Sequence, residues 1–86
     1  MKTMYVGAIS RPGYTHKNVI KTEDLTKAKR AVTKAMRDQE PFHFHVGGMI
    51  FELPVWMADE PLDSWYFTGL DTPIFTKRQG GEWEKF

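Results

Sequence analysis

Two histidines and one glutamate are the side chains in this sequence with the most evident potential for chemistry. His43 and His45 are two residues apart, so in a strand they share a face, and a hairpin around them would place Glu52 opposite His43. Two imidazoles and a carboxylate form a ligand set for a divalent transition metal. No fourth ligand is evident, and Ile50 would lie opposite His45. The pattern therefore fits either a metal or small-ligand site or the solvent-facing side of a sheet, and we expect no cofactor.

A line of cations is the second pattern. Its members recur at intervals of three and four residues, so they share one face of a helix. They are Lys27, Arg30, Lys34 and Arg37. No acid occurs between Asp24 and Asp38, although solvated helix faces usually mix both signs. Such a line suits phosphate groups or an acidic protein surface, and the basic loop 11–17 would extend it. The alternative is an ordinary solvated face, and a net charge near zero disfavours general binding to DNA.

An acidic segment that follows an aromatic residue is the third pattern. Its members are Trp56, Asp59, Glu60 and Asp63. Tryptophan is enriched among the residues that anchor protein interfaces, and Trp56 falls in a connection between elements, where it is expected to be exposed. Trp65 and Phe67 share a face of a predicted strand and are expected in the core. We therefore predict partner-binding residues in both the basic line and the acidic segment.

Groups suited to nucleophilic catalysis are sparse. The sequence has three histidines, two serines (Ser10 and Ser64) and no cysteine, and their spacing indicates no nucleophile with its base. A chain of this size also has little room for a deep pocket. We predict a protein that is not an enzyme.

The elements that must position these residues follow from the hydrophobic pattern. Residues 3–9 and 18–22 are predicted to be strands that pair across a turn at Pro12–Gly13. The spacing of the apolar residues predicts a helix over 25–38 with Asp24 as its N-cap. The basic line then lies on the exposed face of this helix.

After the helix the period of the pattern changes from 3.6 to 2. Residues 42–46 alternate strictly, and Gly47–Gly48 separate them from the apolar run 49–53, which predicts a hairpin with a two-residue turn. In that register His43 opposes Glu52, and one face of the hairpin is wholly apolar. That face, expected to pack against the helix, consists of Phe42, Phe44, Val46, Met49, Phe51 and Leu53.

The remaining residues predict further strands. One is expected over 64–70, and a terminal hairpin is expected around Gly80–Gly81. The expected pairs of that hairpin are Arg78 with Trp83, Lys77 with Glu84, and Phe75 with Phe86. The economical fold is α+β, an antiparallel sheet with one amphipathic helix packed on one face, in the order β-β-α-β-β-β-β-β.

Length and charge limit the classes of protein to which this sequence can belong. A chain of 86 residues is expected to form one domain, 1–86, and 41% hydrophobic residues argue against disorder. The net charge of +1 conceals a split, since residues 1–37 carry +7 and residues 38–86 carry −6. No apolar run reaches the roughly 18 residues of a membrane span, and the N-terminus lacks a signal-peptide core. We therefore expect a cytoplasmic protein without membrane contact, and the sequence does not indicate its oligomeric state.

The architecture also resembles a known class of small proteins. The stretch from Thr22 to Ala31 (Thr-Glu-Asp-Leu-Thr-Lys-Ala-Lys-Arg-Ala), set between a strand pair and a strand hairpin, looks like that of phage-encoded accessory proteins such as anti-CRISPR proteins and inhibitors of host enzymes. The resemblance covers about half of the chain and transfers no functional residue. It implies a small protein that binds and blocks a larger host or defence complex. Two alternatives stay open: nucleic-acid binding through the basic helix face, and a metal or small-ligand site at His43, His45 and Glu52.

Overall fold

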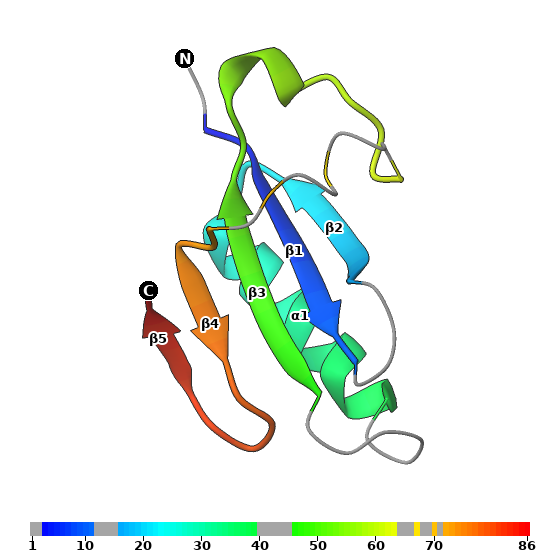
Figure 1. Ribbon diagram of the computed structural model, residues 1–86, viewed down its shortest axis with the longest axis vertical. Coiled ribbons are helices and arrows are strands. Elements are labelled where there is room, and N and C mark those ends of the chain that lie inside the picture. Colours follow the sequence, from blue (N-terminus) through cyan, green and yellow to red (C-terminus); the bar gives the residue numbers. More distant parts are fainter. Residues whose placement is uncertain (1–2, 12–15, 40–45, 64–66, 68–69, 71) are drawn as a thin grey trace.

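A five-stranded antiparallel sheet with one helix across it forms the fold in the computed structural model, which describes residues 3–11, 16–39, 46–63, 67, 70 and 72–86 (Figure 1). The sheet has the order β2-β1-β3-β4-β5. The elements are β1 (Tyr5–Ser10), β2 (Lys17–Thr22), α1 (Leu25–Gln39), β3 (Gly47–Glu52), the 3₁₀ helix η1 (Val55–Met57), β4 (Phe75–Lys77) and β5 (Trp83–Lys85). The predicted α+β class, with one helix against an antiparallel sheet, is confirmed.

The N-terminal half follows the sequence prediction closely. β1 and β2 pair antiparallel, with an irregularity in register between Gly7 and Ala8. The helix begins after Asp24, whose Oδ1 accepts a hydrogen bond from the Lys27 amide at 3.1 Å. This bond satisfies one of the free amides of the first turn, as expected of an N-cap. Among the described residues, no helix is both long and apolar enough to cross a membrane.

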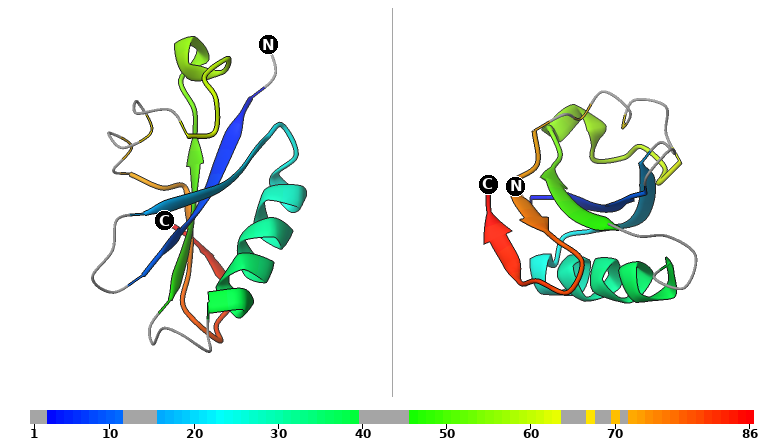
Figure 2. Two further views of the ribbon diagram at one scale, coloured as in Figure 1. Left: turned by 90° about the vertical axis from the view of Figure 1, so that its right-hand side faces the viewer. Right: turned by 60° about the horizontal axis from the view of Figure 1, so that its bottom comes forward.

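One core lies between α1 and the sheet (Figure 2). It contains Ile9, Val32, Met36 and Val46, all almost fully buried. The helix sits very close to the sheet at Gly48, because a Cβ there would lie 2.7 Å from Val32 Cγ1 and 2.8 Å from Met36 Sδ. Those distances are shorter than carbon and sulfur atoms tolerate, so glycine is required for this packing.

The predicted hairpin around Gly47–Gly48 is wrong. Both glycines belong to β3, where they pair with Ser10 and Ile9 of β1. Neither has the positive φ that a two-residue hairpin turn requires, whereas Gly80 does, with φ of 75°. The expected partners 42–45 lie outside the described residues.

Because β3 runs through both glycines, the side chains that face the helix also differ from those predicted. Gly48 faces α1, so its neighbour on that face is Ile50, while Met49 and Phe51 point to the opposite face. The predicted packing of Met49, Phe51 and Leu53 against the helix is therefore wrong, because the strand continues through the glycines and keeps its alternation.

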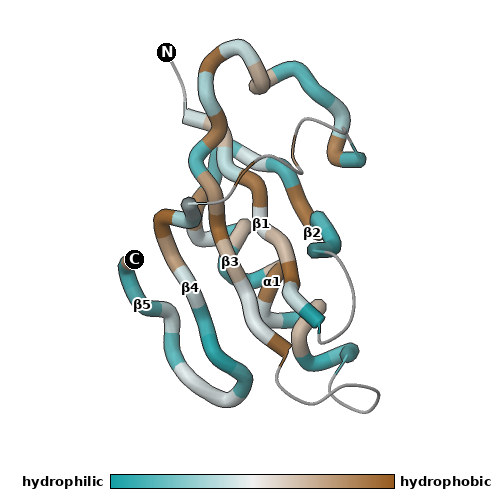
Figure 3. The backbone as a smooth tube through the Cα atoms, in the orientation of Figure 1, coloured by the Kyte–Doolittle hydropathy of each residue, from teal (hydrophilic) through white to brown (hydrophobic). Residues whose placement is uncertain are grey.

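A second core occupies the face of the sheet away from α1. It contains Val6, Leu53, Met57 and Phe67, with Met4 and Leu70 packed against it. The segment after β3 covers this face, and Figure 2 shows it on the other side of the sheet from the helix. Figure 3 shows hydrophobic residues along β1, β2 and β3, the strands that separate the two cores.

The terminal hairpin exists, but its register differs by one residue from the prediction. Lys77 pairs with Trp83, Thr76 with Glu84, and Phe75 with Lys85. The reason is a wider turn: the Gly81 amide donates to the Arg78 carbonyl at 2.9 Å, and Gly80 takes the positive φ between them.

Only two residues of the strand predicted over 64–70 are described, Phe67 and Leu70. The Leu70 amide donates to the Phe67 carbonyl at 3.2 Å. A bond between residues three apart closes a turn, so these two residues do not form the predicted strand.

Candidate functional site

A basic groove runs between α1 and the β4–β5 hairpin. Its main hollow has a volume of about 380 Å³ and is lined by Thr26, Lys29, Arg30, Thr33, Lys34, Arg37 and Trp83. A second hollow of about 270 Å³ shares Thr33 and Arg37 with the first and adds Lys77 of β4. Five cations from the helix and the hairpin thus border these two adjoining hollows, which we together call the basic groove.

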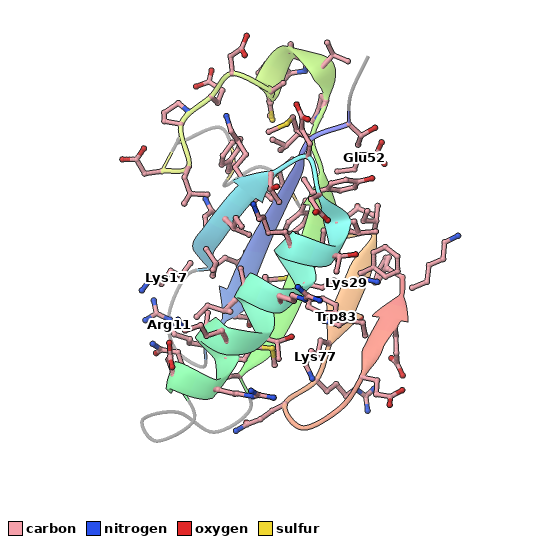
Figure 4. All side chains as sticks on the ribbon, turned by 180° about the vertical axis from the view of Figure 1, so that it is seen from behind. Arg11, Lys17, Lys29, Glu52, Lys77 and Trp83 are labelled. Atoms are coloured by element: carbon pink, nitrogen blue, oxygen red, sulfur yellow. The ribbon has the colours of Figure 1, made fainter. Side chains whose placement is uncertain are left out.

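Trp83 closes the groove on the hairpin side. Its indole is half-buried and packs against the core beneath α1. A Cβ on Gly48 would lie 3.4 Å from Trp83 Cη2, so the same glycine that admits the helix also admits this ring. Lys77 is the cross-strand neighbour of Trp83 and shares its face of the sheet. Figure 4 shows Lys29, Trp83 and Lys77 together between α1 and the hairpin.

The cations of the groove differ in whether their charged groups already contact other groups of the protein. Lys29 Nζ lies 4.0 Å from the centre of the Phe75 ring, a cation–π contact, and Lys77 Nζ donates to the Gly81 carbonyl. Within the described ranges, no ion pair joins Arg30, Lys34 or Arg37 to a carboxylate, and all three side chains are exposed. As far as the described residues go, these three cations keep their charge available to a ligand.

The segment that carries Trp56 and several acids lies on the face of the sheet opposite to α1. We call residues 54–63 the acidic knob. Val55 and Trp56 are 66% and 64% exposed, which makes them two of the most exposed large apolar side chains in the described part of the chain. Asp59 and Asp63 are exposed on the same segment, and Glu60 is half-buried.

Two side chains of β2 hold the backbone of the acidic knob. Lys21 Nζ donates to the carbonyl oxygens of Ala58 at 2.7 Å and Glu60 at 2.6 Å, and Asn18 Nδ2 donates to the carbonyl of Leu62 at 3.0 Å. Met57, next to Trp56, is 93% buried in the second core. These contacts hold the backbone of the acidic knob against the sheet, and the Trp56 side chain is largely exposed.

Not every residue of the predicted basic line belongs to the basic groove. Arg30, Lys34 and Arg37 line the groove, whereas Lys27 is exposed in the first helical turn and does not. The sequence prediction missed Lys77 and Trp83 as groove residues. The correct hairpin register, Lys77 opposite Trp83, is the signal that would have placed both on the helix side of the sheet.

Of the three residues of the predicted metal site, the structure describes Glu52. Glu52 is exposed at the end of β3 and pairs with Tyr5 of β1. His43 and His45 lie outside the described residues. Within the described part of the chain, no three His, Asp or Glu side chains are grouped so as to hold a metal ion.

Comparison with known proteins found no match. No protein-family model, curated protein or solved structure is significantly similar to this chain. An assignment of function must therefore be argued from the basic groove and the acidic knob.

Proposed function

We propose that this protein is a non-enzymatic binding protein that docks on a larger protein through the acidic knob. The observation that carries the proposal is Trp56, 64% exposed on a backbone that Lys21 and the buried Met57 hold in place. Large aromatic side chains that project from rigid backbone are the usual anchors of protein interfaces.

Rigidity makes Trp56 a favourable anchor. Binding costs free energy whenever a side chain or loop must be ordered, and a backbone that is already fixed avoids most of that cost. Burial of an anchor tryptophan in a partner's pocket commonly contributes about 2–4 kcal/mol to binding. Val55, beside it and equally exposed, adds apolar area to the same contact.

The acids of the acidic knob indicate the chemistry of the partner. Asp59 and Asp63 are exposed on the same ten-residue segment as Trp56. A fitting partner presents an apolar pocket with Lys or Arg at its rim, because such charges match the carboxylates and speed association. Occupation of that pocket would block whatever the partner normally binds there, and this is the mode of action that the resemblance to phage-encoded inhibitors of host or defence complexes implies.

Affinity capture from bacterial lysate, followed by mass spectrometry, tests the proposal. Trp56→Ala removes the anchor, and Phe86→Ala is the matched control because it removes another exposed aromatic ring, 73% exposed, outside the knob. We expect specific proteins to be retained by the wild type and Phe86→Ala and lost with Trp56→Ala. Asp59→Lys with Asp63→Lys should weaken the same capture. Identical capture by Trp56→Ala and the wild type would contradict the proposal.

A further inference from the structure

We propose that the basic groove is a second binding site, and that its ligand is single-stranded nucleic acid. Phosphates would lie along Arg30, Lys34 and Arg37, and one base would stack on Trp83. The inference is independent of the acidic knob, since the groove and the knob lie on opposite faces of the sheet.

The charge available in the groove is suited to a phosphate chain. Arg30, Lys34 and Arg37 form a row along α1, with steps of about 6 Å and about 4.5 Å along the helix axis. Within the described residues no carboxylate pairs with any of the three. A row of cations on a helix can contact a chain of repeated negative charges, and no acid in the described part of the chain forms an ion pair with this row.

Trp83 is the feature that favours nucleic acid. Its ring borders the groove beside the helix cations, and its contact with the core near Gly48 limits its movement. A positively charged groove combined with an aromatic stacking surface is the common design of proteins that bind single strands. The carboxylates of an acidic peptide would engage the cations, but a carboxylate has no aromatic face to stack on the ring.

The same feature favours single strands over duplexes. The bases of a duplex are stacked on each other, so a base can lie flat on Trp83 only where it is unpaired. The net charge of +1 does not oppose this, because charges more than about 8–10 Å apart are largely screened at physiological salt. Asp59 and Asp63 lie across the sheet from the groove and act mainly on their own face.

Fluorescence anisotropy with labelled dT12, measured on the full chain between 50 and 300 mM KCl, tests the inference. Three phosphate contacts predict a slope of log Kobs against log salt of about −2. Lys34→Ala should reduce the magnitude of the slope to about 1.4. Lys17→Ala is the matched control, an exposed lysine on the other side of α1, and should leave the slope unchanged (Figure 4).

Substitutions of Trp83 separate stacking from charge. Trp83→Ala should weaken dT12 binding by about 5- to 150-fold without altering the salt slope, and Trp83→Phe should restore most of the affinity. Circular dichroism checks that the variants are folded. If Trp83→Ala does not fold, Lys34→Glu with Arg37→Glu, both on exposed positions, should abolish dT12 binding in a folded protein.

Three results would overturn the inference. One is no binding of dT12 at 50 mM KCl. Another is equal affinity for a 12-base-pair duplex and dT12, with no effect of Trp83→Ala on either. The third is displacement of dT12 by a 12-residue polyglutamate at equal charge concentration, which would identify the groove as a site for acidic protein segments. Trp56→Ala should bind dT12 normally, so failure here is distinguishable from failure of the proposed function.

Discussion

The basic groove and the acidic knob are held in place by different means. The groove lies between two regular elements, α1 and the β4–β5 hairpin, and its geometry depends on packing at Gly48. The knob is largely irregular backbone, fixed by hydrogen bonds from Lys21 and Asn18. Packing distributes its support over many atoms, whereas the knob depends on a few side chains that reach distant carbonyls. A substitution that disrupts one of the two surfaces should therefore leave the other intact.

The largest effect is expected from Gly48→Ala. The new Cβ would meet side-chain atoms of Val32 and Met36 at distances below 3 Å, so these two side chains would have to shift. We expect the free energy of unfolding to fall by about 1–3 kcal/mol, measured by urea denaturation. The matched control is Gly47→Ala, because the nearest atoms to its Cβ would be 3.8 Å away. Equal loss of stability in the two variants would show that packing at Gly48 does not support the groove.

Lys21→Met is expected to have the next largest effect, confined to the acidic knob. The carbonyls of Ala58 and Glu60 would lose a charged donor, at a cost of about 1–2 kcal/mol. Hydrogen exchange should increase in residues 54–63 and stay unchanged in α1. Lys17→Met on the same strand, where the lysine is exposed, is the control. Faster exchange throughout the molecule would contradict a local clamp.

Asp24→Ala should destabilise α1, the helix that carries most of the cations of the basic groove. Loss of the bond from Asp24 Oδ1 to the Lys27 amide leaves a free amide in the first turn and should cost about 1 kcal/mol. Asp24→Asn keeps an acceptor at the same position and should stay close to the wild type in thermal unfolding. If the asparagine variant is as unstable as the alanine variant, the cap is not the source of the effect.

Charge reversal on either surface should have the smallest effect on stability. Arg30→Glu with Lys34→Glu, or Asp59→Lys with Asp63→Lys, changes only exposed side chains and should alter the free energy of unfolding by less than about 0.5 kcal/mol per residue. A shift in melting temperature comparable to that of Gly48→Ala would mean that these charges support the fold itself.

Two identical dipeptides show what could and could not be predicted from the sequence. Gly80–Gly81 form part of a turn, as expected, because Gly80 needs a positive φ. Gly47–Gly48 were predicted to do the same, but Gly48 is glycine because the helix passes too close for a Cβ. Local sequence does not distinguish a turn from a close approach, since the second depends on an element elsewhere in the chain.

The basic groove and the acidic knob show the same limit of prediction from local sequence. Arg30, Lys34 and Arg37 were predicted together because helical spacing is a local property. The position of Trp83 beside them depends on the register of a hairpin about 45 residues further along the chain. The contacts from Lys21 to Ala58 and Glu60 join residues 37 and 39 apart, and no spacing in the sequence indicates them.

The most direct test compares the proteins captured from nuclease-treated lysate by Trp56→Ala and by Arg30→Glu with Lys34→Glu. If the acidic knob is the protein-binding surface, the partner is lost with the first variant and retained by the second. Retention by Trp56→Ala together with loss in the groove variant would contradict the account, because it would place the protein partner in the basic groove.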